Sequence, residues 1–105
     1  MSEEQVTEWP KNAVGTDLNS VILNCSGTDM MWYEYITIPL QPRLLAHKNF
    51  VLDPSRYYVI KNKTGAFNLK IHFVALSDAG RYKCQERENS SVDKIVELIV
   101  LGKSR

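Results

Sequence analysis

The fold is indicated most clearly by one segment, Leu69-Lys70-Ile71-His72-Phe73-Val74-Ala75-Leu76-Ser77-Asp78-Ala79-Gly80-Arg81-Tyr82-Lys83-Cys84. Apolar residues alternate with polar ones through its first half, so that Phe67, Leu69, Ile71 and Phe73 share one side. This period of two predicts a half-buried strand whose apolar side faces a core. The segment from Ser77 to Gly80 predicts a turn, after which the alternation resumes at Tyr82 and Cys84.

The upstream chain carries a second cysteine and a tryptophan. Residues 20–25 alternate, and we expect Val21, Leu23 and Cys25 to face the core. Trp32 follows in Met30-Met31-Trp32-Tyr33, which completes the order Cys…Trp…Cys. With Asp-x-Gly-x-Tyr-x-Cys at the second cysteine, the chain from about Val14 to Leu101 resembles the immunoglobulin superfamily.

The resemblance implies an all-β fold, a two-sheet antiparallel immunoglobulin-like sandwich with one inter-sheet disulfide between Cys25 and Cys84. The core residues that it implies are Trp32, Leu23, Leu69, Ile71 and Tyr82. Closing a loop of about 60 residues would stabilise the fold by about 4 kcal/mol and would require an oxidising compartment. The alternative is two buried free thiols, as in intracellular muscle immunoglobulin domains.

Length and composition predict a single domain. The chain has 105 residues, 44% hydrophobic residues and a net charge of +1. We expect one immunoglobulin-like domain over 1–105, with a core from about 5 to 101 and a boundary or tail at 102–105. The balanced charge argues against nucleic acid as a partner, and the absence of a run of about 18 apolar residues argues against direct membrane insertion.

The variable type of domain is favoured over the intermediate type. The span from Trp32 to Cys84 has room for two extra strands, which we expect around Leu44 and at 49–52. We also expect an edge strand at 5–9, a strand at 56–60, a polar loop at 85–91 and a last strand at 94–101. In variable-type domains the residues that match Arg56 and Asp78 form a structural salt bridge, which a guanidinium can make bidentate. The last strand lacks the Phe/Trp-Gly-x-Gly motif of antigen receptors, which argues against an antibody or T-cell-receptor chain.

The outward side of the central strands is unusually apolar for a solvated sheet. Alternation places on it Met31, Tyr33, Tyr35, Leu44, Lys83, Gln85, Ile95 and Ile99. Exposed tyrosine, methionine and aliphatic side chains indicate a partner surface, and variable-type domains commonly pair through this sheet face. The alternative is that tyrosine and isoleucine are there for their β-propensity alone.

Three Asn-x-Ser/Thr sequons are candidate glycosylation sites. Asn62 falls in a predicted turn and is the best candidate. Asn89 is expected at a loop tip, and Asn24 is a poor candidate beside the cysteine.

These features predict an extracellular recognition module of a cell-surface or secreted protein. It would bind a protein partner, or pair with itself as a homodimer, in immunity or adhesion. Two alternatives stay open: a ligand-binding ectodomain segment of a receptor kinase, and a structural domain of an intracellular array. Catalysis is not expected, because His47 and His72 are far apart in sequence and are interpreted as solvated surface residues. No cofactor or metal is expected, since no metal-ligand spacing occurs.

Overall fold

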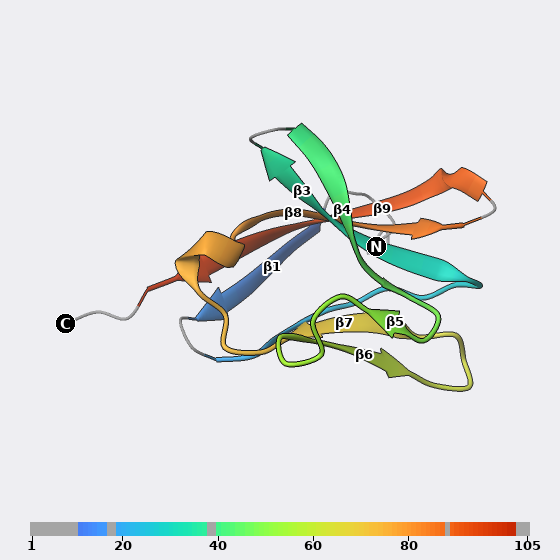
Figure 1. The fold of residues 1–105 in the computed structure, drawn as a ribbon, viewed down its shortest axis with the longest axis horizontal. Coiled ribbons are helices and arrows are strands. Elements are labelled where there is room, and N and C mark those ends of the chain that lie inside the picture. The colour runs from blue at the N-terminus through green and yellow to red at the C-terminus, as the bar shows by residue number, and fades with distance from the viewer. Residues whose placement is uncertain (1–10, 17–18, 38–39, 88, 103–105) are drawn as a thin grey trace, which may run out of the picture.

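A computed structural model describes residues 11–16, 19–37, 40–87 and 89–102. These residues form nine strands and one short 3₁₀ turn, η2 (Figure 1). The strands are β1 (Lys11–Thr16), β2 (Val21–Leu23), β3 (Met30–Thr37), β4 (Leu40–His47), β5 (Phe50–Val51), β6 (Tyr57–Lys61), β7 (Phe67–Ile71), β8 (Gly80–Glu86) and β9 (Asn89–Leu101). The turn η2 covers Leu76–Asp78 and precedes β8.

The described strands build two sheets. The larger sheet has the order β1-β9-β8-β3-β4-β5, and the smaller has β2-β7-β6. Figure 1 shows β6 and β7 below the larger sheet and the β3–β4 hairpin rising away from β8 and β9. Neighbouring strands are antiparallel except β1, which runs parallel to β9. Two extra strands, β4 and β5, extend the larger sheet beyond β3, and this is the variable-type arrangement.

The core lies between the sheets, around the disulfide. The Cys25–Cys84 bond links β8 to the chain just after β2, which confirms the predicted inter-sheet disulfide. Trp32 packs there with no exposed surface, and its Nε1 donates a 2.7 Å hydrogen bond to the Phe67 carbonyl across the two sheets. Of the other core residues expected from sequence, Leu69 and Ile71 are fully buried, and Leu23 and Tyr82 nearly so.

At the corner before β8, Asp78 accepts a hydrogen bond from a tyrosine hydroxyl and forms an ion pair with an arginine. Tyr82 Oη donates to the Asp78 carbonyl at 2.6 Å. Arg56 Nη2 lies 2.6 Å from Asp78 Oδ2, while Arg56 Nε donates to the His72 carbonyl. The Arg56 guanidinium therefore binds one carboxylate and one backbone carbonyl. Its ion pair with Asp78 uses a single nitrogen and is not bidentate. Burial raises the pKa of Tyr82 well above its usual value, because the ionised phenolate would lose its hydration.

The expectation that Phe73 faces the core is wrong. Strand β7 ends at Ile71, and Phe73 is 67% exposed with a φ of 52°. This left-handed turn breaks the alternation, so that the next residue, Val74, is fully buried. The Val74 amide donates to the Asn19 carbonyl and fixes the chain in this path.

Replacing Phe73 with asparagine is expected to stabilise the fold. A non-glycine residue in the left-handed region costs about 1–2 kcal/mol, whereas asparagine tolerates that region. Because the Phe73 ring is mostly exposed, little burial is lost. We expect Phe73→Asn to raise the free energy of unfolding by about 1 kcal/mol in urea titrations. Phe73→Ala removes the same ring but lacks the polar side chain that lets asparagine tolerate the left-handed region, so it serves as the control. Equal stability of the two variants would show that asparagine relieves no backbone strain at this site and would contradict the prediction.

Two other expectations need adjustment. The polar loop at 85–91 is mostly strand, because β8 continues to Glu86 and β9 begins at Asn89, which is paired with Glu86. Asn89 therefore opens a strand and does not lie at a loop tip. The edge strand expected at 5–9 lies outside the described residues.

Candidate functional site

The outward surface of the larger sheet, termed the outer face below, carries a row of neighbouring side chains. Strand registers place Leu44 opposite Tyr33, Tyr33 opposite Lys83, and Lys83 opposite Ile95, so the row crosses β4, β3, β8 and β9. All four residues are half-buried. Side chains directly opposite one another across strands lie close enough to pack, and the row is therefore a continuous surface.

A β-bulge sets this register. In the β3–β4 pairing Trp32 is opposite Ala46 but Tyr33 is opposite Leu44, which leaves Leu45 as an extra residue on β4. Leu45 and Ala46 are consecutive, yet both are fully buried. The bulge thus brings Leu44 beside Tyr33 on the outer face. Simple alternation along β4 does not predict this arrangement.

Lys83 is held between two tyrosines. Its Nζ lies 5.6 Å from the ring centroid of Tyr33 and 5.4 Å from that of Tyr35. A cation above an aromatic face contributes about 0.5–1 kcal/mol at an exposed site. Contacts of this kind favour one arrangement of the side chains, and side chains that are already arranged lose less entropy when a surface is covered.

A second row lies beside the first, towards the turn that precedes β3. Met31 pairs with Gln85 on one side and with His47 on the other, and Tyr33 Oη lies 3.6 Å from Met31 Sδ. His47 is half-buried, and its Nε2 lies 2.8 Å from Asp29 Oδ1. The interpretation of His47 as a solvated residue is therefore wrong. The hydrogen bond from His47 lowers the pKa of the Asp29 carboxyl, since it favours the ionised form.

Ile99 is separate from these rows. On β9 the ion pair between Arg81 and Glu97, with a 2.7 Å contact, lies between Ile95 and Ile99. Ile99 is 44% exposed and lies opposite the exposed Val14 of β1. The structure therefore brings together six of the seven predicted interface residues: Met31, Tyr33, Tyr35, Leu44, Gln85 and Ile95. Ile99 belongs with Val14 at the edge of the sheet.

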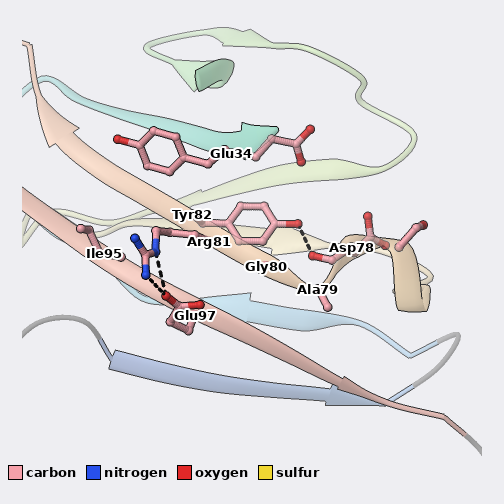
Figure 2. Close-up of a pocket in the computed structure, with 10 residues that line it drawn as sticks. Glu34, Asp78, Ala79, Gly80, Arg81, Tyr82, Ile95 and Glu97 are labelled. Atoms are coloured by element: carbon pink, nitrogen blue, oxygen red, sulfur yellow. Dashed lines mark hydrogen bonds and ion pairs between the residues drawn. The ribbon is translucent and has the colours of Figure 1, made fainter. Parts of the chain in front are cut away.

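A cleft of about 670 Å³ opens next to the rows (Figure 2). The pairing of β3 with β8 ends at Glu34 and Tyr82, but β3 continues to Thr37 alongside β4. The cleft lies at this divergence and is lined by Glu34, Tyr35, Ser77, Asp78, Ala79, Gly80, Arg81, Tyr82, Ile95 and Glu97. Sequence reasoning missed it, because no local pattern shows where two paired strands separate.

Each carboxylate in the cleft has its own arginine. Glu34 pairs with Arg43, Asp78 with Arg56, and Glu97 with Arg81. The charges are thus neutralised within the chain, and Tyr35 and Ile95 contribute aromatic and aliphatic surface to the lining. Such a cleft fits an apolar side chain better than a charged one, because a buried charge would need a partner of its own.

Within the described ranges no group of three or more His, Cys, Asp or Glu side chains is placed to hold a metal ion. In the same part of the chain, no helix is long and apolar enough to cross a membrane.

Known proteins resemble this chain in structure. No protein-family model matches it, and no curated protein sequence matches it. The first Ig domain of the mouse polymeric immunoglobulin receptor has a TM-score of 0.76 at 19% identity, covering 91% of this chain and 94% of that one. The ZIG-8 IG1 homodimer has a TM-score of 0.73 at 21% identity, with 93% and 86% covered.

A third structure, Dpr11 IG1 bound to DIP-gamma IG+IG2, has a TM-score of 0.71 at 23% identity, covering 89% of this chain and 100% of that one. At these identities the likeness establishes the fold alone. The chain therefore has the fold of an immunoglobulin domain, with the sheet layout of the variable type.

Proposed function

We propose that this chain is an extracellular recognition module that binds a protein through the outer face of its larger sheet. The row Leu44–Tyr33–Lys83–Ile95 carries the proposal. Tyrosine is enriched at the centres of protein interfaces, and here the rings of Tyr33 and Tyr35 both lie within reach of the Lys83 ammonium on one face of the sheet. Rigid aromatic side chains of this kind supply contact area at a low entropic cost.

The structural neighbours support binding to protein in general terms. ZIG-8 IG1 forms a homodimer, and Dpr11 IG1 is bound to DIP-gamma. An immunoglobulin fold serves many functions, so the neighbours add an analogy and the face itself carries the proposal. The disulfide supports an extracellular location, because such bonds persist in oxidising compartments.

The cleft supplies the centre of the proposed contact. Binding energy concentrates where a side chain fills a water-excluded pocket. An aliphatic or aromatic side chain of the partner would enter between Tyr35 and Ile95, while the surrounding ion pairs form a polar rim. The two candidate partners are a second copy of the chain and a different protein.

Sedimentation equilibrium across a concentration series tests the first of these partners. We expect the wild-type chain to associate, and Tyr33→Glu to weaken association at least about tenfold, because the change removes the aromatic contact surface and places in the contact a carboxylate that must lose its hydration there, even beside Lys83. Tyr58→Glu is the matched control, since Tyr58 is 58% exposed on β6 of the smaller sheet. Equal association in the wild type and Tyr33→Glu would exclude the outer face as the contact between copies. A monomeric wild type would make the partner a different protein.

A further inference from the structure

Two of the three sequons have side chains within the described residues, and their surroundings differ. Asn62 follows β6 and begins the turn to β7, whereas Asn24 directly follows β2. Both asparagines are exposed. Exposure therefore does not distinguish them, and the backbone around each must decide which can be modified.

The Asn62 turn is closed by local hydrogen bonds. Asn62 Oδ1 accepts from the Thr64 amide at 3.0 Å, from the Thr64 hydroxyl at 2.8 Å and from the Ala66 amide at 3.0 Å. All three bonds go to the amide oxygen, and all three donors lie within four residues. The sequon hydroxyl is thus folded back onto the asparagine amide in a compact surface turn, where an enzyme can reach both groups together.

Hydrogen bonds and the disulfide fix the backbone that follows Asn24. The Cys25 amide donates to Asn68 Oδ1, and the Cys25 carbonyl accepts from the Phe67 amide. Ser26 forms a bridge with Ala66. The middle residue of the sequon, Cys25, is buried in the disulfide. Fitting this segment into the active site of an enzyme would break its hydrogen bonds to the sheet and would also disrupt the core packing of Cys25.

We propose that Asn62 is a site of N-linked glycosylation and that Asn24 is not. The donor is an oligosaccharide linked through pyrophosphate to a membrane lipid of the secretory pathway. Asn62 Nδ2 forms a bond to the anomeric carbon of the sugar and loses one proton to a base of the transferring enzyme. The bond from that carbon to the pyrophosphate oxygen breaks, and the lipid pyrophosphate leaves with the electron pair.

The modification is compatible with the fold and with the outer face. Only Nδ2 is used, so Oδ1 keeps its three hydrogen bonds. The turn joins strands of the smaller sheet, and the Gly65 carbonyl within it accepts from the Gly27 amide. Tyr33 lies on the larger sheet, so a glycan on Asn62 projects from the other layer. It therefore covers neither the row nor the cleft.

Peptide mapping tests the proposal. The chain is expressed in mammalian cells behind a cleavable secretion leader, then treated with peptide N-glycosidase in ¹⁸O-labelled water, which marks each released asparagine as labelled aspartate. We expect the label at position 62 and none at position 24. Secreted and cell-retained protein are both mapped. An unlabelled Asn62 in both fractions, or a labelled Asn24, would overturn the proposal.

Two conservative variants separate recognition from folding. Thr64→Ala removes the sequon hydroxyl but keeps the Asn62 bonds to the Thr64 and Ala66 amides, so we expect a folded chain without the label. Thr64→Ser restores the hydroxyl and is expected to restore the label. In the matched change at the other sequon, Ser26→Ala should leave the labelling at Asn62 unchanged. Persistence of the label in Thr64→Ala would contradict sequon-dependent transfer.

Discussion

Replacing Cys25 and Cys84 together with alanine is expected to lower the free energy of unfolding by about 4 kcal/mol. The bond closes a loop between residues 59 positions apart, and opening it returns conformational freedom to the unfolded chain. Since small domains are stable by only about 5–15 kcal/mol, this loss is a large fraction of the total. Urea titration followed by circular dichroism measures the difference.

A reductant provides the control for this experiment. Dithiothreitol should shift the urea midpoint of the wild type towards that of the double variant and leave the double variant unchanged. Equal midpoints for the wild type and the double variant would show that the disulfide does not stabilise the fold. That result would favour the alternative of a structural domain from a reducing compartment.

Trp32→Ala is expected to destabilise the fold by a similar amount. Trp32 has no exposed surface, and its indole joins the two sheets through the hydrogen bond to the Phe67 carbonyl. Truncation of a buried tryptophan costs about 3–5 kcal/mol, because the cavity left behind closes only in part. Trp32→Phe keeps a ring but loses the hydrogen bond, so we expect an intermediate loss of about 1–3 kcal/mol.

The same urea titrations rank these variants. Tyr58→Ala, at an exposed position of β6, is the control and should change stability by no more than about 0.5 kcal/mol. A Trp32→Phe variant as stable as the wild type would show that the indole hydrogen bond contributes nothing. A Trp32→Ala variant as stable as Tyr58→Ala would contradict the central place of Trp32 in the core.

Short-range pattern was enough to predict the fold. The alternation in residues 67–71, the paired cysteines and the tryptophan each reflect contact with one core, so each is visible as residue type and spacing. The hydrogen bond at the corner before β8 is equally local, because the Tyr82 hydroxyl reaches the Asp78 carbonyl only four residues earlier.

Features set by distant contacts could not be predicted. Phe73 leaves the alternation because the chain turns through a positive φ and Val74 is tied to Asn19. The bulge at Leu45 and the divergence of β3 from β8 depend on how two strands pair, which neither strand shows by itself. The His47–Asp29 contact likewise joins residues from separate elements. Residue pattern could therefore predict which side chains share the outer face. It could not predict the cleft beside them, which depends on where β3 separates from β8.

The most direct test of the proposed function is a binding screen against an array of extracellular immunoglobulin-type ectodomains that includes this chain itself. We expect at least one specific partner, with binding lost in Tyr33→Glu and Ile95→Glu and retained in Tyr58→Glu. This outcome would place the contact on the row and cleft of the larger sheet. Binding that survives both outer-face changes, or that is lost equally in Tyr58→Glu, would contradict the proposal.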